Sequence, residues 1–183
     1  MNYLWLTPEQ LKQIIHHASH SSPHECCGLL VGKESRVIEV IEVENIAKDS
    51  QHFFYISPSD LATHLPRIAE QGRDLLGIYH SHPHGNPIPS AHDIQLSNYP
   101  NTVSLIIGMG TSSPTYAAWE IVNGRVDRVP IHVSTIAPEP ADYSYDNSPS
   151  NAQNFTLILC TGLAVAIMLI LAIALLPPAP PIP

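Results

Sequence analysis

Residues 75–93 read LLGIYHSHPHGNPIPSAHD, and this stretch decides how the middle of the chain folds. Residues 75–82 are apolar enough for a buried β-strand, and residues 82–89 form a loop rich in Pro and Gly. Ser90 then begins a helix whose first turn contains Asp93. The stretch therefore predicts a strand, a long loop and a helix that folds back toward the end of the strand.

Two histidines, His80 and His82, end the predicted strand with one residue between them, so their side chains point to the same face. Two imidazoles on one face can share a metal ion, and the loop is long enough to bring Asp93 back to them. Two nitrogens and one carboxylate oxygen leave a fourth position for water, which is the arrangement of a catalytic zinc site. The pattern predicts one zinc ion per chain, and such an ion lowers the pKa of its water to about 7.

A zinc hydrolase also needs a proton acceptor that is not a metal ligand, and Glu25 is the candidate. It precedes an apolar strand, where its carboxylate can overhang the metal site, take the proton of water and return it to the leaving amine. The hydroxyl of Ser90 is the candidate donor to the oxyanion that develops during attack.

Each of these features also has a simple structural interpretation. Two histidines with one residue between them, as at His80 and His82, can arise by chance in a chain with 11 histidines. Ser90 and Asp93 fit a helix capping box, and Glu25 fits a solvated loop carboxylate. It is the combination, in this order and spacing, that favours catalysis.

The combination resembles the JAMM (MPN+) metalloprotease family, whose motif is an upstream Glu followed by H-x-H-P-x6-S-x-x-D. Residues 23–32, PHECCGLLVG, are also similar to the start of the stand-alone prokaryotic members. The resemblance covers roughly residues 7–133. It implies an α/β (α+β) domain with a cytidine-deaminase-like mixed β-sheet flanked by helices. It also implies zinc on His80, His82 and Asp93, with Glu25 as general acid and base and Ser90 as oxyanion support.

The resemblance further implies hydrolysis of a peptide or isopeptide bond, often after the C-terminal glycine of ubiquitin, a ubiquitin-like β-grasp protein or a sulfur carrier. The alternative is a membrane-anchored, non-catalytic scaffold of the same fold that binds a ubiquitin-like partner. Non-catalytic relatives usually lack one or more metal residues, whereas all are present here, so an enzyme is expected.

The rest of the domain shows the alternation of helices and strands that is typical of this class. Residues 123–124, Asn-Gly, predict a hairpin turn between the last two strands. The expected helices are residues 7–18 and 57–71, and the expected strands are residues 27–31, 36–43, 53–56, 103–109, 116–122 and 126–133.

Composition excludes some classes of function. A net charge of −8 with 8 Lys and Arg provides no basic cluster, which argues against nucleic acid as a ligand. Cys26 and Cys27 are adjacent and give no disulfide framework; small buried thiols are the expected interpretation. A solvated or cleft-lining role is expected for His84 and a surface role for His92.

The C-terminal quarter has a different composition from the rest. Residues 137–154 are rich in Pro, Ser, Asn and Asp, which predicts a linker after a domain of residues 1–136. Residues 155–176 are uncharged and long enough to cross a bilayer as a helix, and residues 177–183 form a short Pro-rich tail. We therefore expect a single-pass C-terminal membrane anchor with the catalytic domain in the cytoplasm, because the chain shows no signal peptide and no paired cysteines.

Overall fold

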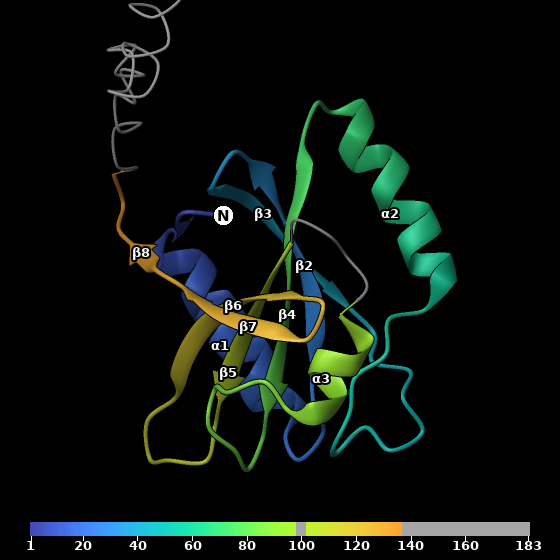
Figure 1. Ribbon diagram of the computed structural model, residues 1–183, viewed down its shortest axis with the longest axis vertical. Coiled ribbons are helices and arrows are strands. Elements are labelled where there is room, and N and C mark those ends of the chain that lie inside the picture. Colours follow the sequence, from blue (N-terminus) through green and yellow to red (C-terminus); the bar gives the residue numbers. More distant parts are fainter. Residues whose placement is uncertain (98–101, 137–183) are drawn as a thin grey trace, which may run out of the picture. The chain divides into compact units, whose positions relative to one another are not determined.

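The computed structural model describes residues 1–97 and 102–136 (Figure 1), and these lie within one compact unit, Met1–Ala137. The expected linker, membrane helix and tail, residues 137–183, lie outside the described residues, so the expected anchor is neither supported nor contradicted. Within the described part of the chain, no helix is both long and apolar enough to cross a membrane.

The described residues form three helices and eight strands. The helices are α1 (Pro8–Ser21), α2 (Pro58–Glu70) and α3 (Ala91–Leu96). The strands are β1 (Leu4–Leu6), β2 (Cys27–Lys33), β3 (Arg36–Val43), β4 (Asp74–His82), β5 (Val103–Gly108), β6 (Thr115–Val122), β7 (Arg125–Val129) and β8 (Ile131–Val133).

All eight strands belong to one mixed sheet in the order β7-β6-β5-β4-β2-β3-β1-β8. The pairs β4–β5, β1–β3 and β1–β8 are parallel, and the others are antiparallel. Strands β7 and β8 stand at the two ends of this order, yet only Pro130 separates them in the chain. The sheet must therefore curl until its two edges almost meet. The expected mixed α+β sheet flanked by helices is therefore confirmed.

The two faces of the sheet bury different helices, as Figure 1 allows the reader to follow. On β2 and β4, Leu30 and Tyr79 point to the core that α1 covers with Ile14 and Ala18. Leu29 and Ile78 point to the other core, where Ile68 of α2 packs. The strand period of two therefore assigns neighbouring residues of β4 to opposite sides of the sheet.

Both long helices begin where the sequence predicts. The hydroxyl of Thr7 accepts from the N–H of Gln10, whose side chain accepts from the N–H of Thr7, a complete capping box. Ser57 caps α2 in the same way, by accepting from the N–H of Asp60. The hairpin is confirmed as well, since Asn123 and Gly124 both have positive φ between β6 and β7.

Two strand predictions are wrong. Residues 53–56 form no strand, because the Asn45 side chain takes over their backbone bonds: it donates to the carbonyl of Phe53 and accepts from the N–H of Tyr55. Residues 126–133 form two strands rather than one, because Pro130 has no N–H and marks the point where the chain passes from one end of the sheet to the other. Strand β1 was not predicted; its three residues are too few for a periodic signal.

Candidate metal centre

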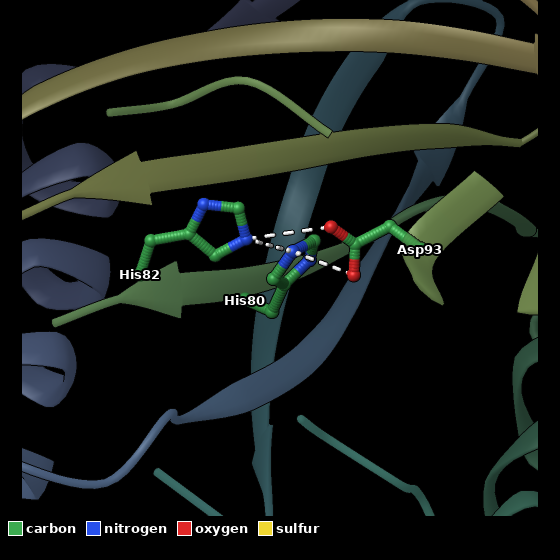
Figure 2. Close-up of side chains that lie close together, drawn as sticks. All are labelled: His80, His82 and Asp93. Atoms are coloured by element: carbon green, nitrogen blue, oxygen red, sulfur yellow. Dashed lines mark hydrogen bonds and ion pairs between the residues drawn. The ribbon is translucent and has the colours of Figure 1, made fainter. Parts of the chain in front are cut away.

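Three side chains converge at the end of β4. His80 and His82 leave the same face of this strand, and Asp93 reaches them from the first turn of α3 (Figure 2). His80 is fully buried, His82 is partly exposed and Asp93 is buried. Among the described residues, they are the only group of three or more His, Cys, Asp or Glu with donor atoms close enough to hold one metal ion.

The donor atoms of the three side chains lie close enough together to share one ion. The two Nε2 atoms are 3.2 Å apart, and they lie 3.4 Å from Oδ1 and Oδ2 of Asp93, respectively. Ligand bonds of about 2.0–2.1 Å at tetrahedral angles put neighbouring donors roughly 3.3–3.4 Å apart. Each of these three pairs is close to that separation, so the three residues can offer one donor each to a single ion.

The ionisation of His80 and of Asp93 also suits a cation. Burial lowers the pKa of His80, so this imidazole is neutral and has a lone pair available. Burial disfavours the charged forms of His82 and Asp93, but two sets of contacts outweigh it: Asp93 and the Asn86 carbonyl act on His82, and His80 and His82 act on Asp93. These contacts raise the pKa of His82 and hold the pKa of Asp93 well below its usual range.

Neighbouring groups fix the orientation of each ligand. Nδ1 of His82 lies 3.0 Å from the carbonyl of Asn86, which can only accept, so this nitrogen carries the proton and Nε2 is free to bind a cation. His80 stacks on Phe54 with ring centroids 4.4 Å apart. Oδ2 of Asp93 accepts from the N–H of Ser90 at 2.7 Å.

Glu25 lies just before β2 on the face that carries the histidines. The β2–β4 ladder ends at the pair Cys27–His80, and Glu25, two residues before Cys27, interacts electrostatically with His82. The side chain is 5% exposed, and Oε2 has no hydrogen-bond partner among the described residues. Burial raises the pKa of Glu25 to about 7, an effect that His82 opposes and Asp93 reinforces. Such a carboxyl can accept a proton at neutral pH and release it again.

Ser90 caps α3, as expected from the capping-box pattern of Ser90 and Asp93. Its Oγ accepts from the N–H of Asp93 at 3.2 Å, and the carboxylate of Asp93 accepts from the N–H of Ser90. This box uses a lone pair of the hydroxyl and leaves its proton free to donate elsewhere. The cap and the expected oxyanion contact are therefore compatible, and the second stays a prediction.

The loop between the histidines and Ser90 is held by strands β5 and β6. The indole N–H of Trp119 donates to the carbonyl of Pro87 at 2.8 Å, and the N–H of Gly110 donates to the carbonyl of Gly85 at 3.1 Å. A Cβ on Gly108 would lie 2.7 Å from Cδ of Pro87, so glycine is needed for this close approach.

The remaining candidates lie apart from the metal-binding group. His84 is exposed on the loop, in agreement with a solvated role. His92 is less exposed than expected: it packs on Phe53 and, with Asp93, lines a cavity of about 120 Å³. Cys26 and Cys27 are buried free thiols, and burial raises their pKa to about 11 and 12, which agrees with a structural rather than nucleophilic role.

Sequence reasoning missed the residues that support the site. Phe54 was assigned to a strand, and Trp119 to a strand without a further role. The buried hydroxyl of Ser81 was read only as the residue between two ligands. A usable signal existed for Ser81, because a serine at an inward position of a buried strand must find a hydrogen-bond partner.

Comparison with known proteins agrees with this geometry. Residues 7–122 match the family described as prokaryotic homologs of the JAB domain. The chain is 32% identical over 109 residues to a desampylase of Haloferax volcanii, covering 56% of this chain and 78% of that protein. It is 34% identical over 79 residues to a probable TtuB-protein conjugate cleaving protease of Thermus thermophilus, covering 43% and 53%. The solution structure of a Desulfitobacterium hafniense protein is similar, with a TM-score of 0.65, 29% identity, and coverage of 72% of this chain and 92% of that one.

Proposed function

The chain belongs to the family of prokaryotic homologs of the JAB domain, and from this membership we propose that it is a zinc-dependent isopeptidase or peptidase. Its relatives include a desampylase and a probable conjugate-cleaving protease, which supports a hydrolase. The observation that carries the proposal is the convergence of His80, His82 and Asp93, whose donor atoms lie close enough to share one ion.

In this proposal, His80, His82 and Asp93 hold one zinc ion. When bound, zinc lowers the pKa of a coordinated water to about 7 and polarises the scissile carbonyl. The protein contributes the fixed directions of the ligands: the Asn86 carbonyl sets the His82 tautomer, and the Ser90 N–H holds the Asp93 carboxylate.

Glu25 moves the protons. Its carboxyl takes a proton from the attacking water and delivers it to the leaving amine, which is a primary amine of lysine when the bond is an isopeptide. Two features support this role. Its Oε2 is buried without a partner among the described residues, and its pKa of about 7 lets both the charged and neutral forms exist at neutral pH. The Ser90 hydroxyl donates to the carbonyl oxygen as negative charge develops there.

The proposed substrate is a conjugate of a ubiquitin-like β-grasp protein that is attached through its C-terminal glycine. The names of the relatives support conjugates as the substrate class. The net charge of −8 and the absence of a basic cluster from the sequence support a protein substrate over a nucleic acid.

Cleavage of defined conjugates tests this function. β-Grasp proteins ending in Gly-Gly are each joined by an isopeptide bond to a lysine of a reporter protein and incubated with zinc-loaded enzyme. We expect release of the intact β-grasp protein with a free C-terminal glycine, loss of activity with a chelator and recovery on addition of zinc. Tight binding of such conjugates by the zinc-loaded protein without any cleavage would instead support the non-catalytic scaffold.

We also propose that residues 155–176 anchor the enzyme to a membrane, with the domain in the cytoplasm. The support is their length and lack of charge. Deletion of residues 155–183 is expected to move the protein from the membrane fraction to the soluble fraction while kcat stays unchanged. Membrane association of the truncated chain would contradict a sole anchor at these residues.

A further inference from the structure

Ser81 lies between the two histidine ligands but faces the other way. Because side chains alternate along β4, Ser81 points with Tyr79 toward the α1 side of the sheet, whereas His80 and His82 point to the metal centre. Ser81 is completely buried. Its hydroxyl therefore touches neither a metal ion nor a substrate.

The hydroxyl of Ser81 is bonded to the residue that follows Glu25. Its Oγ accepts from the N–H of Cys26 at 2.9 Å, and its own N–H donates to the carbonyl of Cys26 at 3.1 Å. In a regular antiparallel pair the two residues exchange both bonds through their main chains. Here a side-chain oxygen makes one of them, at the point where the chain enters β2.

This contact joins the segment that carries Glu25 to β4, the strand that carries His80 and His82. Glu25 has two other backbone anchors, since its N–H donates to the carbonyl of Ser50 and its carbonyl accepts from the side chain of Asn45. Both anchors belong to the segment between β3 and α2. Neither of them links Glu25 to β4, the strand that carries the histidines.

We propose that Ser81 is a positioning residue that sets the distance and angle of Glu25 relative to His80 and His82. The inference rests on the proposed function, because it concerns how the proton acceptor of that reaction is placed. Loss of the hydroxyl leaves the Cys26 N–H without its acceptor and lets the chain at Glu25 shift, while the ligand atoms stay on β4. A displacement of about 1 Å at a reacting group is enough to lower a rate roughly 100-fold.

Three variants of the full chain test the proposal: Ser81→Ala, Ser81→Thr, and Thr7→Ala as a control. The control removes a hydrogen bond that caps α1, outside the metal centre, and so reports the effect of a general loss of stability. Zinc content, thermal melting and amide exchange at Cys26 are measured for each. The kcat and KM are measured with a β-grasp protein that carries a C-terminal Gly-Gly aminocoumarin amide.

For Ser81→Ala we expect faster exchange of the Cys26 amide, one zinc per chain, an unchanged KM and a kcat about 10- to 100-fold lower. Ser81→Thr keeps the acceptor and should stay within about threefold of the wild-type kcat, and Thr7→Ala should do the same. In a Glu25→Asp background, Ser81→Ala should have little further effect, because the proton acceptor is already displaced.

Several results would overturn the proposal. The first is loss of zinc from Ser81→Ala. The second is a fall in kcat in a folded Ser81→Thr variant, or in Thr7→Ala, as large as that in Ser81→Ala. The third is a double variant of Ser81→Ala and Glu25→Asp whose fall in kcat equals the product of the two single falls. The exchange measurement needs no substrate. If the wild-type enzyme cleaves no probe, the proposed function fails, whereas the Cys26 contact is still judged by its amide exchange.

Discussion

The two halves of the site are built in different ways. The segment from His80 to Asp93 is local: a strand end, a loop and a helix cap bring three ligands together within a short length of chain. Glu25 lies 55 residues before His80 and reaches the centre only because β2 pairs with β4. The first half is fixed by local geometry and the second by the register of the sheet.

This difference separates the two tasks of the site. The local half fixes the donor spacing, which a metal ion requires to within tenths of an ångström. The half that depends on the sheet places Glu25, the proposed proton acceptor, which must be close to the metal but not coordinated. Substitutions in the local half should therefore remove both metal and activity, whereas substitutions on the Glu25 side should remove activity alone.

The largest effect is expected from His80→Ala. The variant loses one of three ligands and leaves the buried carboxylate of Asp93 with one histidine fewer. Zinc content should fall from about one per chain to a level below detection, and kcat/KM should fall roughly 10³- to 10⁶-fold. Metal analysis of the purified protein and the conjugate assay measure both quantities.

The matched control is His84→Ala, which changes an exposed histidine of the adjacent loop. Zinc content and rate should remain within about twofold of wild type, because surface substitutions away from the site usually have small effects. Equal zinc loss in the two variants would show that the loop, rather than the three converging ligands, binds the metal.

Glu25→Gln should separate metal from activity. The amide has nearly the same shape as the carboxyl but cannot accept the proton of water, so kcat should fall about 10²- to 10⁴-fold while zinc stays at one per chain. Glu44→Gln is the control, because Glu44 is an exposed acid just after β3. A zinc-free Glu25→Gln protein would mean that Glu25 is a ligand, and the distinction between the two halves would be lost.

The same substitution should stabilise the metal-free protein in a pH-dependent manner. Burial raises the pKa of Glu25 from 4.5 to about 7, so the folded state favours the protonated carboxyl. The stabilisation from this proton is complete below the unfolded pKa and is lost as pH rises through about 7. Glu25→Gln has no such ionisation, so its free energy of unfolding at pH 8 should be about 1–3 kcal/mol higher than that of the wild type.

Urea unfolding of both metal-free proteins at pH 5 and pH 8 measures this difference. His82 and Asp93 interact with Glu25, so the gap between the two proteins measures the ionisation of Glu25 together with its coupling to these two groups. A gap of the same size at the two pH values would argue that Glu25 keeps an ordinary pKa in the fold.

The features of the fold that the sequence predicts are mostly those that depend on neighbouring residues. The caps at Thr7 and Ser57, the Asn123-Gly124 turn and the strand that ends in His80 and His82 all depend on neighbouring residues, and all were predicted. The strand error at residues 53–56 comes from a side-chain contact that no periodic pattern shows, made by Asn45 eight and ten residues earlier. The sheet curls so that Pro130 can connect β7 and β8 at its two ends, and this depends on strand pairs that form only in the folded chain.

The site shows the same pattern. The spacing of His80, His82 and Asp93 was enough to predict that they converge, because a strand and the first turn of a helix have known geometry. The placement of Glu25 came from family resemblance and not from spacing. The supports come from the opposite face of β4 (Ser81), from an irregular segment (Phe54) and from another strand (Trp119), and only the buried serine gave a sequence signal.

The smallest effect is expected at Trp119, whose support of the site is indirect. Trp119→Phe keeps an aromatic ring but removes the N–H that holds the Pro87 carbonyl at 2.8 Å. Trp5→Phe is a matched control, because its indole N–H donates to Ser134 at 2.9 Å and is not part of the loop that carries the ligands. Each variant should lose about 1 kcal/mol of folding free energy, the usual net contribution of one hydrogen bond.

Only Trp119→Phe should also weaken zinc binding, by about three- to tenfold, because the loop it holds carries the Asn86 carbonyl that orients His82. Competition with a zinc chelator measures the affinity, and thermal melting measures the stability of each variant. If both variants lose the same stability and keep the same zinc affinity, the loop does not depend on β6 for its shape. The ligands would then be held by the 80–93 segment alone, which would make the local half of the site still more independent of the sheet.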